Sequence, residues 1–101
     1  MATSPLTEAE ISTRLARLDH WQREGDTITR TFELTSYAAG LAFASAVGTI
    51  ADAFDHHPDI LITWRKVRVS FTTHDAGRKL SYKDFDVAEA LDALKVKKPE
   101  N

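Results

Sequence analysis

Residues 67–72 read Val-Arg-Val-Ser-Phe-Thr, and apolar and polar side chains alternate along them without a break. A period of two is typical of a strand that buries one face and leaves the other to solvent. Residues 28–34 show a similar pattern, because Ile28, Phe32 and Leu34 share one parity. Both stretches are predicted to be half-buried antiparallel strands, and the rest of the fold is arranged around them.

The other elements are predicted from caps, turns and apolar periodicity. Thr7 and Glu10 form a capping box before a helical apolar stripe, and Gly25-Asp26 suits a tight hairpin turn. The predicted elements are a helix over 7–18, strands over 21–24 and 27–34, a helix from 36 or 37 to 54, strands over 60–64 and 67–71, and a helix over 81–94. This α-β-β-α-β-β-α order predicts an α+β fold: a four-stranded antiparallel sheet with three helices packed on one face.

The middle helix also carries a stripe of small residues. Gly40, Ala44 and Gly48 recur every four residues, so they share a face that another backbone can approach closely. Packing on the sheet is the preferred interpretation of this stripe, and an oligomer contact is the alternative.

Composition limits the class of protein. A chain of 101 residues with 43% hydrophobic residues is predicted to form one domain over residues 1–101, with an ordered core at about 6–96 and disorder at 1–4 and from 97 onward. A net charge of −2 argues against a nucleic-acid partner, and the absence of cysteine excludes disulfides and thiolate zinc sites. No secretory signal is recognised, and the uncharged run at 36–51 is too short for a membrane span. We therefore expect a soluble, cytoplasmic protein with no membrane partner.

Three of the four histidines are the candidates for chemistry. His56 and His57 follow the middle helix, and His74 follows the last strand. If residues 60–64 and 67–71 pair as a hairpin, the three imidazoles meet at one edge of the sheet. Imidazole transfers protons readily near neutral pH, so such a group can supply both an acid and a base.

Each of these residues has a structural alternative. His56 and His57 are also suited to a helix C-terminus, where the helix dipole favours cations. His74 alone fits a solvated strand end, and Asp84, three residues after Ser81, can simply cap the last helix. A metal site is a rival for the histidines, but adjacent side chains diverge, which disfavours convergence on one ion.

The spacing of these residues resembles a known family. Asp52-Ala-Phe-Asp-His56-His57-Pro58, followed by Trp64, His74 and Asp84, is similar to the signature of the pterin-4a-carbinolamine dehydratases. The resemblance extends over about residues 6–94. Asp52 stands where the family more often has Glu, and the loop from His74 to Asp84 is one residue longer than in the animal enzymes.

The resemblance implies a hydro-lyase, a carbon–oxygen lyase without cofactor or metal. Its substrate would be a 4a-hydroxytetrahydropterin, which loses water to give a quinonoid dihydropterin in tetrahydrobiopterin recycling. His56 and His74 would form the acid/base pair, and His57 would mainly bind substrate. The implied catalytic set is His56, His57, His74 and Asp84, and the implied substrate-binding set is Asp52, His57, Pro58, Thr73, His74, Asp75 and Ala76. Within these sets Asp52 and Asp84 would orient or tune the imidazoles.

The family also implies partners. We expect a homodimer or homotetramer, and a functional link to an aromatic amino-acid hydroxylase. The alternative function is a non-catalytic module of the same fold, which would bind a pterin without turnover or act as a dimerisation cofactor of a transcription factor.

Overall fold

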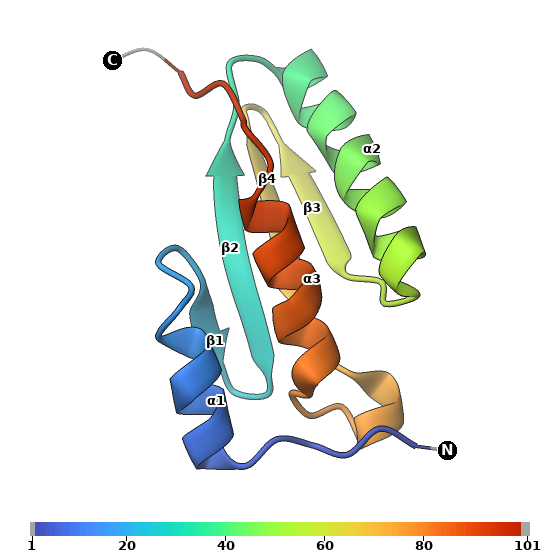
Figure 1. The fold of residues 1–101 in the computed structure, drawn as a ribbon. Coiled ribbons are helices and arrows are strands. Elements are labelled where there is room, and N and C mark those ends of the chain that lie inside the picture. The colour runs from blue at the N-terminus through green and yellow to red at the C-terminus, as the bar shows by residue number, and fades with distance from the viewer. Residues whose placement is uncertain (1, 100–101) are drawn as a thin grey trace.

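The computed structural model describes residues 2–99 (Figure 1). Its elements in chain order are α1 (Glu8–Leu15), β1 (Gln22–Glu24), β2 (Thr27–Glu33), α2 (Tyr37–Phe54), β3 (Asp59–Thr63), β4 (Lys66–Phe71), a short 3-10 helix η1 (His74–Ala76) and α3 (Tyr82–Asp92). The predicted α-β-β-α-β-β-α order is confirmed, and η1 is added to it.

The four strands form one antiparallel sheet in the order β1-β2-β4-β3. The two predicted hairpins are present, and β4 pairs with both β2 and β3. The register places Ile28 opposite Phe71 and Ile60 opposite Val69, so apolar side chains of neighbouring strands share one face. The alternation in the sequence therefore matches the pleat of the sheet.

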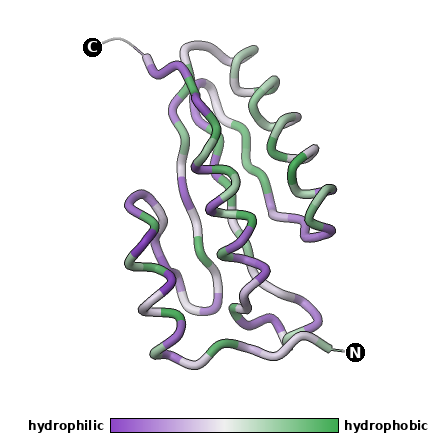
Figure 2. Tube along the Cα trace, in the orientation of Figure 1, coloured by the Kyte–Doolittle hydropathy of each residue, from purple (hydrophilic) through white to green (hydrophobic). Residues whose placement is uncertain are grey.

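All three helices pack against this apolar face, with α3 lying between α1 and α2 (Figure 1). Val67, Val69 and Phe71 are completely buried beneath them. Figure 2 shows that α2 is hydrophobic along most of its length, whereas hydrophobic and hydrophilic residues alternate in α1 and α3. An amphipathic pattern is expected where a helix has one face on a core and one in water.

Local capping fixes where the helices begin. Thr7 and Glu10 form the predicted capping box of α1, and Ser81 and Asp84 form a second capping box at α3. Two predicted helix ends are too late, because α1 stops at Leu15 and α3 at Asp92. After α1 the backbone tightens, since the amide of Leu18 donates to the carbonyl of Leu15 in a three-residue turn.

The small-residue stripe of α2 packs on the sheet at only one end. A methyl group added at Gly40 would lie 3.5 Å from Cγ2 of Val67, whereas one added at Gly48 would meet nothing within 4 Å. By length and composition α2 would also pass as a membrane span, as core helices of soluble proteins do. Its buried face, which includes Phe43 and Val47, lies against the sheet.

The chain ends were expected to be disordered. Residues 1, 100 and 101 lie outside the described residues. Within residues 2–99, the Thr3 hydroxyl donates to a carboxylate oxygen of Asp75, and Lys98 lines a surface cavity beside β2. Parts of both end segments therefore lie against the fold.

Candidate active site

The β3–β4 hairpin brings the three histidines together. Asp59, the first residue of β3, pairs with Ser70 near the end of β4. Residues that precede β3 and residues that follow β4 therefore meet at one edge of the sheet. A cavity of about 390 Å³ opens there, and it is lined by Asp55, His56, His57, His74, Asp75 and Lys83.

The end of α2 sets the direction of the two adjacent histidines. Asp55 adopts the left-handed conformation with φ 49°, which aspartate tolerates better than most residues. The amide of His56 then donates to the carbonyl of Ala51 and closes the helix. The chain leaves α2 abruptly, and Pro58 holds it extended into β3.

The ring of His56 is held by a buried carboxylate. Nε2 of His56 lies 2.6 Å from Oδ1 of Asp84, with His56 8% exposed and Asp84 fully buried. The other oxygen of Asp84, Oδ2, accepts hydrogen bonds from the hydroxyl of Thr73 at 2.8 Å and the amide of Ser81 at 2.9 Å. The imidazole also stacks on Phe71, with 13° between the ring planes. Both the carboxylate and the ring are therefore fixed.

This arrangement selects one tautomer of His56. A carboxylate accepts hydrogen bonds, so the nitrogen that faces Asp84 carries the proton. Nδ1 of His56 has no hydrogen-bond partner among residues 2–99, and this atom is not fully buried. In the neutral ring Nδ1 therefore offers a lone pair, as a general base requires.

The ring of His57 is held very differently. Its Nε2 lies 2.7 Å from Oδ1 of Asp52 in the last turn of α2, but the two side chains are 59% and 78% exposed. The two adjacent histidines thus bond to different carboxylates. Within residues 2–99, no group of three or more His, Asp or Glu side chains is placed to hold a metal ion.

The cavity is also lined by His74, Asp75 and Lys83, which form a second wall after β4. His74, at the start of η1, is exposed and has no side-chain partner within residues 2–99. Asp75 accepts a hydrogen bond from the Thr3 hydroxyl at 2.9 Å and lies 3.6 Å from Nζ of Lys83. That hydroxyl, with the charge of Lys83 as a smaller contribution, lowers the pKa of Asp75 below its ordinary value. This wall therefore carries a carboxylate, an ammonium and a free imidazole.

Comparison with known proteins shows the family of this chain. A family model described as pterin 4 alpha carbinolamine dehydratase matches residues 4–94. The chain belongs to this family. A relative from Roseiflexus sp. (strain RS-1), named as a pterin-4-alpha-carbinolamine dehydratase, is 50% identical over 94 residues, which are 93% of this chain and 99% of the relative.

Two solved structures are also similar. A transcriptional coactivator/pterin dehydratase from Brucella melitensis superposes with a TM-score of 0.81 at 28% identity, over 89% of this chain and 97% of that one. A pterin dehydratase-like protein described as a RuBisCO assembly factor of the alpha-carboxysome superposes with a TM-score of 0.58 at 21% identity, over 73% and 84%. The second likeness shows the fold alone, so pterin 4 alpha carbinolamine dehydratases share their architecture with a protein named for assembly.

Only some of the residues that were expected to bind substrate line the cavity. His56, His57, His74 and Asp75 line it, whereas Asp52 and Asp84 lie behind the histidines they bond. Pro58, Thr73 and Ala76 do not line it.

Thr73 lies within the protein, beside the site. Its side chain is 1% exposed, its amide donates to the carbonyl of Lys79, and its carbonyl accepts from the amide of Ala76. These groups are engaged within the protein, and the Thr73 hydroxyl donates to Asp84. Ala76 is itself buried in η1, at 7% exposure.

Two lining residues were missed by the sequence analysis. Asp55 was hidden because its place depends on the left-handed turn that ends α2. Lys83 was not predicted because its sequence context is that of an ordinary lysine in the first turn of α3, next to Asp84. Its neighbour in the sequence was the only available signal.

Proposed function

We propose that this chain dehydrates a 4a-hydroxytetrahydropterin to a quinonoid dihydropterin by histidine acid/base catalysis. One observation carries the proposal: three imidazoles line one cavity, and the ring of one of them is hydrogen-bonded to a buried carboxylate. Membership of the family supports the substrate class.

The reaction needs two proton transfers and no electron acceptor. The C4a–O bond breaks as the leaving hydroxyl takes up a proton, and water departs. The N5–H bond breaks as its proton goes to a base, and its electron pair forms the N5–C4a double bond. A cavity lined by both an acid and a base is suited to this elimination.

His56 is assigned as the base that removes the N5 proton. Its Nδ1 carries the lone pair, and the ring becomes an imidazolium once the proton arrives. Asp84 stabilises that positive charge at 2.6 Å, in surroundings that exclude water. This is the usual contribution of a carboxylate behind a catalytic imidazole.

His74 is assigned as the acid that protonates the leaving hydroxyl. It lines the cavity from η1, and no described side chain bonds to its ring. The ammonium of Lys83 lines the same wall and favours negative charge on the departing oxygen. His57, backed by Asp52, is assigned to substrate binding.

The decisive experiment is a dehydration assay in which the 4a-hydroxytetrahydropterin is generated in place. We expect a rate well above that of the uncatalysed dehydration, and we expect it to survive exhaustive treatment with EDTA. A rate equal to the uncatalysed one would reject the proposal. Loss of activity in EDTA that zinc or manganese restores would replace it with a metal mechanism.

The second candidate function is a binding or dimerisation module. It is favoured by one observation, the exposed apolar side chains of Tyr37, Leu41 and Phe54 on α2. A dehydration rate equal to the uncatalysed one, together with pterin binding, would support it.

The remaining proposals are a homodimer or homotetramer, a cytoplasmic location, and a functional link to an aromatic amino-acid hydroxylase in tetrahydrobiopterin recycling. Light scattering after gel filtration tests the oligomeric state.

A further inference from the structure

Asp75 and Lys83 form an ion pair at the histidine cavity, and the proton transfers of the proposed reaction do not use its carboxylate. Nζ of Lys83 lies 3.6 Å from Oδ2 of Asp75, and both side chains line the cavity. This separation is too long for a hydrogen bond, so the ammonium protons of Lys83 are available to a ligand. The two charges balance, which favours a neutral ligand with one donor and one acceptor over an ion.

The N-terminal segment fixes the carboxylate of this pair. The Thr3 hydroxyl donates to Oδ2 of Asp75 at 2.9 Å, and the amide of Leu6 donates to the carbonyl of Leu80 at 2.9 Å. The segment therefore lies along the loop between η1 and α3 (Figure 1). Because the Thr3 hydroxyl holds the pKa of Asp75 below its ordinary value, the carboxylate stays ionised and can only accept. Both side-chain contacts engage Oδ2, which leaves Oδ1 for a ligand.

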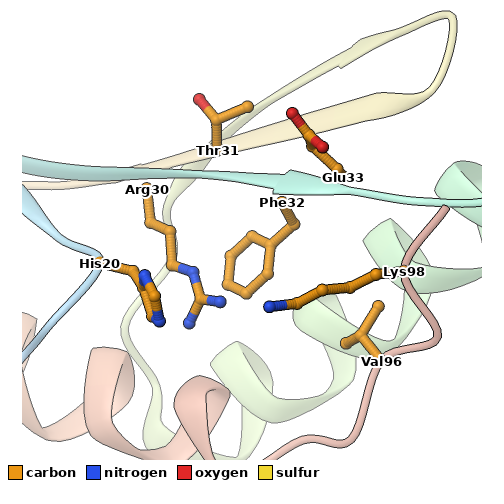
Figure 3. A pocket seen from close by; sticks show the side chains of 7 residues that line it. All are labelled: His20, Arg30, Thr31, Phe32, Glu33, Val96 and Lys98. Carbon is orange, nitrogen blue, oxygen red and sulfur yellow. The ribbon is translucent and has the colours of Figure 1, made fainter. Parts of the chain in front are cut away.

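The cavity beside β2 offers a contrast, because its central guanidinium bonds within the protein. There Nη1 of Arg30 donates to Oδ1 of Asp92 at 2.6 Å, and the guanidinium lies over the ring of Phe32, which is 4% exposed (Figure 3). The side chains of Asp75 and Lys83 are instead 48% and 30% exposed. The pair at the histidine cavity is therefore open to a ligand, whereas that guanidinium is not.

The open pair matches one edge of a pterin ring. At this lactam edge N3 carries a hydrogen and the neighbouring C4 carries an oxo group, so a donor lies next to an acceptor. Oδ1 of Asp75 can accept from N3–H while the ammonium of Lys83 donates to O4. C4 is bonded to C4a, so this orientation also keeps the departing hydroxyl close to the same ammonium.

We propose that Asp75 and Lys83 together recognise the lactam edge and select pteridines that have N3–H beside a 4-oxo group. This inference rests on the proposed function, since it places a pterin in the histidine cavity. Thr3 is a positioning residue in this arrangement, because its hydroxyl holds one oxygen of Asp75 and leaves the other free.

The test is isothermal titration calorimetry of the full chain with pterin and with 2,4-diaminopteridine, at a pH where both rings are neutral. The second ring has a bare N3 and a 4-amino group, so its donor and acceptor are exchanged. We expect pterin to bind about tenfold more tightly, because the other ring leaves the pair unmatched. Equal affinity for the two rings would overturn the inference and leave the dehydration intact. Binding of neither ring would also overturn it, and the dehydration assay then decides separately whether the proposed function survives.

Two aspartates of the same cavity give a matched pair of variants. Asp75→Asn should reduce the preference for pterin to less than about threefold, because its amide can donate as well as accept. Asp55→Asn makes the same change of charge at a residue that forms no ion pair within residues 2–99, and asparagine suits its φ of 49°. We expect Asp55→Asn to keep the preference within about twofold. Equal losses in both variants would show a general effect of charge and would reject the inference.

The N-terminal segment supplies a second pair. Thr3→Val should weaken pterin binding about threefold, Thr3→Ser should restore it, and Ser4→Ala, at an exposed neighbour, should leave it unchanged. Carbon NMR of the Asp75 carboxyl should show its pKa rising in Thr3→Val, since the hydroxyl that lowers it is gone. Unchanged affinity in Thr3→Val, or an equal loss in Ser4→Ala, would overturn the positioning role of Thr3.

Discussion

Two histidine–carboxylate pairs lie next to each other in this molecule, and their bond lengths are nearly the same. The pair His56–Asp84 measures 2.6 Å and the pair His57–Asp52 measures 2.7 Å. The first is buried under α3 and supported by two further hydrogen bonds to the carboxylate, whereas the second is more than half exposed. Distance alone would rank them as equals.

Burial is what separates the two pairs. Water competes for an exposed pair and salt screens it, so such pairs contribute about 0–1 kcal/mol to stability. Inside the protein a hydrogen bond to a charged group contributes more, about 1.5–3 kcal/mol, and a lost partner leaves an unsatisfied group. The buried pair is therefore suited to fix a catalytic ring, and the exposed pair to adjust to a substrate. Substitutions at the two pairs test this contrast.

The largest effect is expected when the ring of the buried pair and its counterpart across the cavity are both removed. The double variant His56→Ala/His74→Ala should bring dehydration close to the uncatalysed rate. Each single variant should lower kcat by about 10²-fold or more, since one positioned acid or base contributes about 10²–10⁴-fold. Steady-state kinetics on variants shown to be folded by circular dichroism measure this. A folded double variant with near-normal kcat would refute this assignment and would indicate that Lys83 or water transfers the protons.

The next effect comes from reversing the tautomer of His56. In Asp84→Asn the amide NH₂ can donate to Nε2, which forces the ring proton onto Nδ1 and removes the base from the cavity. We expect kcat to fall by about 10²-fold and the free energy of unfolding by about 2 kcal/mol. The nitrogen chemical shifts of His56 report the tautomer directly. An unchanged tautomer with reduced kcat would refute this account of the loss.

Asp84 also shows how much of the structure can be predicted from the sequence. Its spacing from Ser81 predicts a capping residue and its place in the motif predicts a residue of the site, and the structure gives one oxygen to each task. Helix starts and strand alternation were predictable because they depend on residues a few positions apart. The short helix η1 was not, since Gly77 at φ 74° and the bridge between Thr73 and Lys79 belong to a loop without periodicity.

The same limit applies to the cavity. The histidines were predicted to meet because hairpin pairing follows from two patterned strands. The burial of Thr73 and the presence of Lys83 depend on how α3 packs against the end of β4, which no local pattern records. Contacts that depend on the packing of distant elements are therefore the ones that sequence patterns do not predict.

A smaller effect is expected at Thr73, whose hydroxyl bonds to the buried carboxylate of Asp84. Thr73→Val removes the hydroxyl that donates to Oδ2 of Asp84 and leaves the volume nearly unchanged. We expect kcat to fall about tenfold with KM within about twofold, and Thr73→Ser to restore most of the loss. A purely structural role would lower the melting temperature of Thr73→Val without changing kcat at a temperature where the variant is folded. That outcome would remove Thr73 from the positioning network.

The smallest effect is expected at the exposed pair. His57→Ala should raise KM about fivefold and leave kcat within about twofold, because a binding contact of about 1 kcal/mol is lost equally from substrate and transition state.

Asp52→Asn should raise KM by about twofold and change stability by less than about 0.5 kcal/mol, since the pair is open to water and ions. Kinetics at low and high salt sharpen the comparison: salt should reduce the difference between Asp52→Asn and the unaltered chain, and leave the effect of Asp84→Asn unchanged. If Asp52→Asn instead lowers kcat as strongly as Asp84→Asn does, burial is not what distinguishes the two pairs, and the assignment of His56 as the base loses its physical reason.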